Sequence, residues 1–223
     1  MRKLAVVVAV LAVVLVVIGV VADRAVAAVA ERTISSRIQQ SVAGASSVST
    51  SIAGMPVLTQ VAHGSLDHVT VTVADLVTGT GPAIGSAVVD LYDVSTSSPR
   101  TAKRVEATAD ISTAELQKAL GESWTIEPDG DALAVTWTGG LQLAAVIVPS
   151  VRDGKLVLDL ASVTILGVSV DGSLVPAVVK ERVAAVASSV GDLPFGLVPS
   201  SVAVTPQGVR LVATGTDVGL EKA

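Results

Sequence analysis

The sequence predicts an α+β fold: an N-terminal transmembrane helix, residues 1–22, followed by one domain, residues 23–223. Three observations support this prediction. The run Leu4–Ala22 contains no charged residue, apolar residues recur at helical spacing over Asp23–Val42, and several later segments alternate apolar and polar residues. Helical spacing followed by strand alternation in one chain is typical of a mixed fold with an antiparallel sheet.

The apolar run is long enough to cross a bilayer, because 19 helical residues cover roughly 28 Å. Ala25-Val26-Ala27 offers a signal-cleavage pattern, but Asp23 and Arg24 intervene between it and the apolar run. An uncleaved, single-pass signal anchor in the inner (plasma) membrane is therefore favoured, with a cleaved exported form as the alternative. Arg2 and Lys3 favour a cytoplasmic N-terminus, which places the domain on the outer or periplasmic side.

The composition excludes several classes of function. The chain carries 20 acidic and 15 basic residues, and this balance opposes binding to nucleic acid phosphates. Without cysteine it has no disulfide, thiolate zinc site or cysteine nucleophile. Only four residues are aromatic, so the core is filled by Val, Ala, Leu and Ile or is not completely filled. Small aliphatic walls around unfilled volume suit acyl chains, although a GC-rich genome also produces an Ala- and Val-rich chain.

The first part of the domain reads as a helix followed by irregular segments. Ala27, Ala30, Ile34 and Ile38 form an apolar stripe on the predicted helix Asp23–Val42. Residues 44–50 are rich in Ser, Ala and Gly, and Gly54-Met55-Pro56 interrupts the stretch from Ile52 to Val61. We therefore expect irregular structure between this helix and the first strand.

Strands follow from about residue 68. Val69, Val71 and Val73 alternate with threonines, residues 86–94 resume the pattern after a Gly- and Pro-rich turn, and residues 104–111 alternate cleanly. Ser112 and Glu115 form a capping box that starts a short helix through Leu120.

The second half predicts more hairpins and one more helix. Strands at 124–127, 132–138 and 155–166 are separated by Gly-containing turns and indicate an antiparallel meander. Ser173 as a cap and Pro176 in the first turn begin a second long helix that ends near Val190. Two short strands, 202–205 and 209–214, finish the chain.

No catalytic motif stands out. His63 and His68 are the only histidines, and a metal or a general base would have to use them, but no third ligand has recognisable spacing. The G-x-S-x-G nucleophile elbow is absent from the sequence. The sequence thus predicts a protein that is not an enzyme and needs no metal or cofactor.

Two apolar stretches outside regular periodic segments, 52–66 and 193–198, are the best functional candidates. Exposed apolar loops often mark contact with a membrane or a ligand, and the alternative is that these loops cap the ends of the core.

Two parts of the chain carry a resemblance to a known family. They are the stretch Pro56-Val57-Leu58-Thr59-Gln60-Val61 with the following Gly64, and the run from Leu193-Pro194-Phe195 to the Val204-Thr205-Pro206-Gln207-Gly208-Val209 segment. In these parts the chain resembles the actinobacterial LmeA-like phospholipid-binding proteins. The resemblance covers most of the exported part. It implies a strongly curved antiparallel sheet wrapped around a long helix, as in tubular lipid-binding domains, an affinity for phospholipids, and a role in lipoglycan assembly of the cell envelope.

Two hypotheses follow. The first is a membrane-tethered module that binds a phospholipid or another acyl-chain lipid. Its predicted lipid-binding residues are Ile34, Ile38, Ile52, Met55, Val57, Leu58, Val69, Val71, Val73, Phe195, Leu197 and Val198. The second is a non-catalytic envelope scaffold with a filled core, and an envelope hydrolase or transferase ranks behind both.

Overall fold

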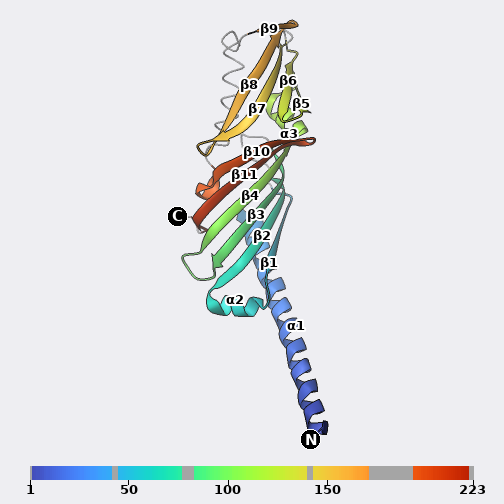
Figure 1. The fold of residues 1–223 in the computed structure, drawn as a ribbon, viewed down its shortest axis with the longest axis vertical. Coiled ribbons are helices and arrows are strands. Elements are labelled where there is room, and N and C mark those ends of the chain that lie inside the picture. Colours follow the sequence, from blue (N-terminus) through green and yellow to red (C-terminus); the bar gives the residue numbers. More distant parts are fainter. Residues whose placement is uncertain (1, 42–44, 77–82, 140–142, 171–192, 221–223) are drawn as a thin grey trace.

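The computed structural model describes residues 2–41, 45–76, 83–139, 143–170 and 193–220. These residues form a mixed fold of two antiparallel sheets and a few helices, with the helix α1 leaving at one end (Figure 1). The predicted α+β class and antiparallel pairing are confirmed. The predicted helix at residues 173–190 lies outside the described residues.

The helix α1 runs without interruption over Arg2–Ser41. Its C-terminal half bears the predicted apolar stripe: Ala27 is buried in the main core, and Ala30 and Ile34 pack against it. Among the described residues, no helix combines the length and the apolar character needed to cross a bilayer. The transmembrane anchor at Leu4–Ala22 stays a prediction.

The larger sheet has six strands in the order β1-β2-β3-β4-β11-β10. Their bounds are Ser47–Ala53 (β1), Ser65–Leu76 (β2), Ile84–Ser95 (β3), Thr101–Ser112 (β4), Val198–Thr205 (β10) and Gly208–Gly219 (β11). The edge strand β1 lies along α1, and three side chains of the helix hold it there. Glu31 Oε1 accepts a 2.8 Å hydrogen bond from the Ile52 amide, Ser35 bonds Thr50 at 3.0 Å, and Gln39 donates to the Ala45 carbonyl at 3.0 Å.

The smaller sheet is the predicted meander, with five strands in the order β5-β6-β7-β8-β9. Its strands are Trp124–Asp129, Ala132–Trp137, Leu143–Arg152, Lys155–Ile165 and Val168–Val170. The helix α3, Thr113–Leu120, leads into it from β4, and Ser112 Oγ accepts the 3.2 Å bond from the Glu115 amide that the capping box predicts.

The apolar core is elongated and divided. One cluster lies between the six-stranded sheet, α1 and the short helix α2, Val57–His63. A second cluster joins the two sheets, because Val204 of β10 and Val209 of β11 pack with Ile126, Leu133 and Val135 of the smaller sheet. A third cluster lies within the smaller sheet around Leu143 and Val163.

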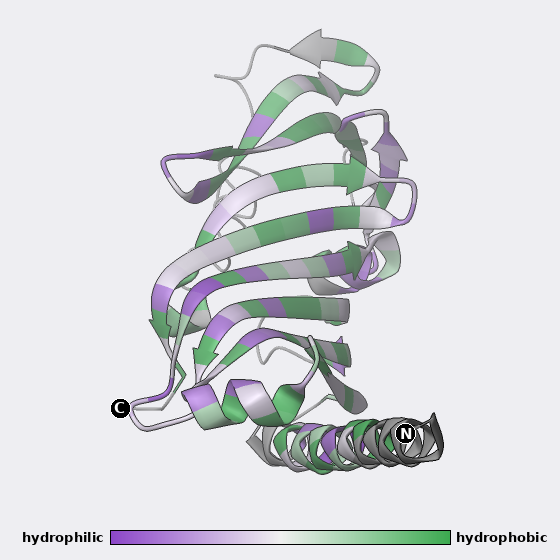
Figure 2. Cartoon of the chain, turned by 60° about the horizontal axis from the view of Figure 1, so that its bottom comes forward, coloured by the Kyte–Doolittle hydropathy of each residue, from purple (hydrophilic) through white to green (hydrophobic). Residues whose placement is uncertain are grey.

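Three predictions about the architecture were wrong. The strands form two sheets rather than one, because the free edge of β4 pairs with β11, while β5 to β9 pair among themselves. The segment expected to be irregular contains the strand β1 and the helix α2. The helix α1 lies along the edge strand β1 rather than at the centre of a wrapped sheet (Figure 2).

Candidate functional site

The six-stranded sheet has one aliphatic face. Strand register places side chains from neighbouring strands in three rows: Val69, Leu91 and Val105; Val71, Val89, Ala107 and Ala213; and Val73, Ala87, Ala109 and Leu211. Alternation of side chains across each strand puts mostly polar residues on the opposite face, where Val88 and Val212 flank Thr108. The valines of β2 are buried, whereas Ala87, Val89, Ala107 and Ala109 at the centre of the sheet are only half-buried.

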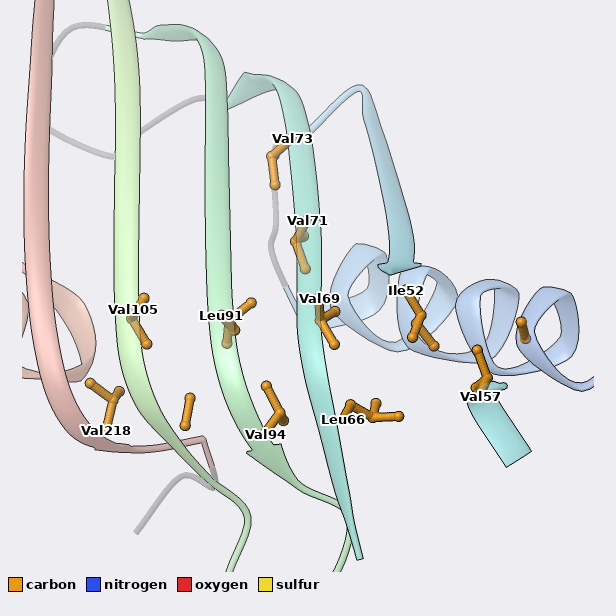
Figure 3. Close-up of a cluster of buried hydrophobic side chains, with 12 residues drawn as sticks. Ile52, Val57, Leu66, Val69, Val71, Val73, Leu91, Val94, Val105 and Val218 are labelled. Carbon is orange, nitrogen blue, oxygen red and sulfur yellow. The ribbon is translucent and has the colours of Figure 1, made fainter. Parts of the chain in front are cut away.

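Five of the predicted lipid-binding residues lie in the main core. Ile52, Val57, Val69, Val71 and Val73 are buried in one cluster at the α1 end of the aliphatic face (Figure 3). Val57 has no exposed surface at all. These residues pack against other side chains of the protein, and their contact with lipid stays a prediction.

Two further predicted residues pack at the border of this cluster. Ile34 approaches it from α1, and Leu197 approaches it from the loop before β10. Leu197 occupies space above β11 that a side chain at Gly215 would fill, because a Cβ there would lie 2.8 Å from Leu197 Cδ2. The side chain of Ile38 lies outside the described ones.

The remaining four predicted residues are exposed and lie in two places. Met55 and Leu58, 63% and 42% exposed, lie just before α2 and in its first turn. Phe195 and Val198, 59% and 48% exposed, belong to the short 3₁₀ helix Pro194–Gly196 (η2) and to the start of β10. The apolar loops are thus partly exposed, as expected for contact surfaces, and partly caps of the core.

The backbone at η2 is unusual. Phe195 has φ 60° and ψ 19°, in the left-handed region that bulky residues rarely adopt. This conformation turns an exposed aromatic ring outward next to Leu197, which packs inward. Left-handed conformations at non-glycine residues often occur at functional sites.

The junction of α1 and α2 contains a site residue that the sequence did not indicate. Asp23 is only 3% exposed, and its Oδ1 accepts a 2.7 Å hydrogen bond from the amide of Leu58 in the first turn of α2. The next residue, Arg24, contacts Met55 through a 2.8 Å approach of Nη2 to Sδ. The position of a carboxylate directly after an apolar run was the available signal, but it predicted only the end of the membrane segment.

An open groove of about 540 Å³ lies between α1 and β1. Its lining is mostly polar and includes Glu31, Arg32, Ser35, Gln39 and Thr50. Glu31, Ser35 and Gln39 already make hydrogen bonds to the segment 45–52, so these side chains hold the two walls of the groove together. The groove was not among the predicted lipid contacts.

The histidines lie apart and belong to different environments. His63 is exposed on α2, whereas His68 lies on the polar face of β2, where its Nε2 is 2.8 Å from Asp90 Oδ1 and its ring stacks on Tyr92 at 4.5 Å. The guanidinium of Arg104 covers the same tyrosine ring at 4.0 Å. Within the described ranges no three metal-ligating side chains come together.

A further pair on the polar face joins β11 to β4. Arg210 of β11 donates from Nε to Asp110 of β4 at 2.7 Å, and this hydrogen bond together with the carboxylate charge raises the pKa of Arg210. The contacts of His68, Tyr92 and Arg210 are those of ordinary cross-strand pairs.

Comparison with known proteins places the chain in a family. No curated protein and no solved structure gives a significant match. A family model, however, matches residues 21–214, which is most of the chain and includes the smaller sheet, most of the larger sheet, α2 and η2. The chain belongs to the LmeA-like phospholipid-binding family.

Proposed function

We propose that this protein binds phospholipid by laying acyl chains along the aliphatic face of the six-stranded sheet. The observation that carries the proposal is the continuity of this face. From Ile52 on β1 to Leu211 on β11, the three rows that cross the sheet contain only Ile, Val, Leu, Ala and Gly, apart from Thr50 at the edge. The family's description as phospholipid-binding supports the same function.

The energetics favour acyl chains over polar ligands. Each CH₂ group removed from water contributes about 0.8 kcal/mol, and an aliphatic face offers dispersion contacts without polar groups that need partners. The small side chains Ala87, Ala107 and Ala109 keep the centre of the face shallow, and they are only half-buried. We place the acyl chains there rather than among the tightly packed valines of β2.

Our proposal includes a place for the protein in the cell. The uncharged run Leu4–Ala22 supports a tether in the plasma membrane, with the domain on the outer side. In that position the protein would take part in assembling lipoglycans or other envelope lipids. Its net charge of −5 disfavours nucleic acid as a partner, and phospholipid binding of this kind requires no catalytic group.

A second function, a non-catalytic scaffold, is favoured by one observation. Near α1 the core is filled by its own side chains, since Ile52, Val57, Val69, Val71 and Val73 are buried against one another and their neighbours. A protein whose whole interior is packed in this way would bind a partner protein through its surface and would carry no lipid.

A pair of substitutions on adjacent residues separates the two functions. Ala107 lies on the aliphatic face between Val89 and Ala213, and Thr108 lies on the opposite face of the same strand. We expect native mass spectrometry of the full chain to detect bound phospholipid in the wild type and in Thr108→Trp, and much less in Ala107→Trp, because an indole fills the shallow centre.

Folding is checked in the same samples by circular dichroism, and the smaller change Ala109→Leu replaces Ala107→Trp if that variant does not fold. Wild-type protein that carries no phospholipid after incubation with phospholipid vesicles would exclude lipid binding and support the scaffold. Equal loss in both tryptophan variants would show that the aliphatic face is not where lipid binds.

A further inference from the structure

The short helix α2 has one side buried in the core and an apolar side that is exposed. Val57 and Gln60 face the core and are buried, while Leu58 and Val61 on the remaining surface are 42% and 45% exposed. Leu58, Val61 and Ala62 are spaced three and four residues apart on α2, so these three residues form one stripe, called here the outer stripe of α2. Thr59 and His63 flank it on the polar side. A helix that is held by one side buried in the core does not need apolar residues on its exposed side for stability.

Several bonds fix the direction in which the outer stripe points. The buried carboxylate of Asp23 holds the Leu58 amide at 2.7 Å, which ties the first turn of α2 to α1. The buried side chain of Gln60 donates to the Ala53 carbonyl at 3.2 Å and accepts from the Asp67 amide at 2.9 Å, which ties α2 to β1 and β2. The stripe is therefore presented by a fixed surface and not by a freely moving loop.

The outer stripe lies next to a second exposed apolar surface. Immediately before Asp23, four valines of α1, Val16, Val17, Val20 and Val21, are about half or more exposed. The two helices meet at the end of the sheet from which α1 departs, and α2 lies crosswise to α1 (Figures 1 and 2). Adjoining apolar surfaces of this kind mark contact with a membrane or a partner protein.

We propose that α2 is an interfacial helix whose outer stripe rests on the surface of the lipid bilayer that holds α1. A bilayer fits both surfaces with one partner. The apolar run of α1 ends at Ala22, and the next residue, Asp23, is hydrogen-bonded to α2. The polar boundary of a bilayer that surrounds this run therefore lies at the level of α2. Arg24, beside Met55, stands at the depth where phosphate groups lie.

This inference rests on the membrane tether of the proposed function and adds to it a defined orientation. Val57 on the inner side of α2 belongs to the same cluster as Ile52, Val69 and Leu91 on the aliphatic face. With α2 on the bilayer, that end of the aliphatic face stands directly above the membrane surface, where an acyl chain can pass between the two without crossing open water.

The absence of native cysteine makes a direct test possible. Single cysteines are introduced into the full chain at Leu58→Cys and Val61→Cys, labelled with an environment-sensitive fluorophore, and the protein is reconstituted into vesicles of phosphatidylcholine and phosphatidylglycerol. Thr59→Cys serves as the matched control on the same helix, and Asp131→Cys in the smaller sheet serves as the distant control.

We expect lipids that carry a spin label near the headgroup boundary to quench the labels at residues 58 and 61 strongly, since interfacial helices bury their apolar side about 5–10 Å into that region. Quenching should be weaker at residue 59 and negligible at residue 131. Flotation of the same vesicles reports the tether separately. Chains that float but show no quenching at 58 and 61 would overturn the interfacial helix alone.

Two other results would also count against the proposal. Chains that do not float would overturn the tether and the interfacial helix together. If the labels at 58 and 61 report an apolar environment only at high protein concentration, and lipid does not quench them, the outer stripe binds a second copy of the chain. Leu58→Glu offers an independent check, because it should abolish the quenching at residue 61 while Thr59→Glu leaves it unchanged.

Discussion

Replacing Asp23 by alanine should loosen α2 without unfolding the protein. The carboxylate accepts the Leu58 amide at 2.7 Å and is 3% exposed, so water does not easily take its place. Loss of a capping side chain costs about 0.5–2 kcal/mol, and a buried donor left without a partner costs about 1–3 kcal/mol. We expect about 2 kcal/mol for the local opening of α2. Val57 and Gln60 still hold the helix against the core, which is why the loss stays local.

Hydrogen exchange of the full chain, followed by mass spectrometry of peptides that cover residues 54–64, measures this opening. A loss of about 2 kcal/mol corresponds to exchange that is about 30-fold faster. Asp23→Asn should keep most of the protection, because an amide oxygen can accept the same hydrogen bond. Asp131→Ala, which removes an exposed carboxylate from the turn before β6, should leave these peptides unchanged. Exchange in Asp23→Ala that matches the wild type would show that the bond does not hold α2.

Two further predictions concern the end of β4, and both are measured as the midpoint of thermal unfolding followed by circular dichroism. Gly208→Ala should lower it strongly, because the new Cβ would lie 2.1 Å from the Ile111 carbonyl oxygen, whereas Gly219→Ala in the same strand has open space and should be neutral; equal midpoints would contradict the close approach. Ser112→Ala should lower the stability by about 1 kcal/mol through loss of the cap of α3, and Ser112→Asp should retain most of the wild-type stability. A Ser112→Ala variant that unfolds at the wild-type midpoint would show that the cap is dispensable.

The parts of the fold that the sequence predicts are those set by neighbouring residues. The alternation of Val69, Val71 and Val73 identified β2, and the Ser112 capping box located α3, because period and capping act within a few positions. The strand β1 was missed because its inward-facing Val48, Thr50 and Ile52 alternate with serines, a composition that also fits a loop. Its pairing with β2 and its bonds from α1 make it a strand.

The separation into two sheets and the helix α2 depend on contacts that no local pattern reveals. Arg210 and Asp110 pair at a separation of 100 residues, and this pairing of β11 with β4 makes the meander a sheet of its own. At α2, Pro56 was taken as a break in regular structure, whereas it occupies the position before the first helical residue, which tolerates proline.

The candidate site was only partly predicted because it, too, depends on contacts between distant parts of the chain. Apolar residues outside periodic segments were chosen as lipid contacts, and this criterion cannot separate Val57, which closes the core, from Leu58, which is exposed one position later. Only the orientation of α2 separates them, and that orientation is fixed by the buried Gln60 together with Asp23, 35 residues earlier than Leu58 in the chain. A charged residue that sequence reasoning assigns to the end of a membrane segment thus helps to fix which apolar side chains α2 exposes. The hydrogen bonds that connect α1 to α2 therefore distinguish the two residues, since hydropathy alone gives Val57 and Leu58 the same role.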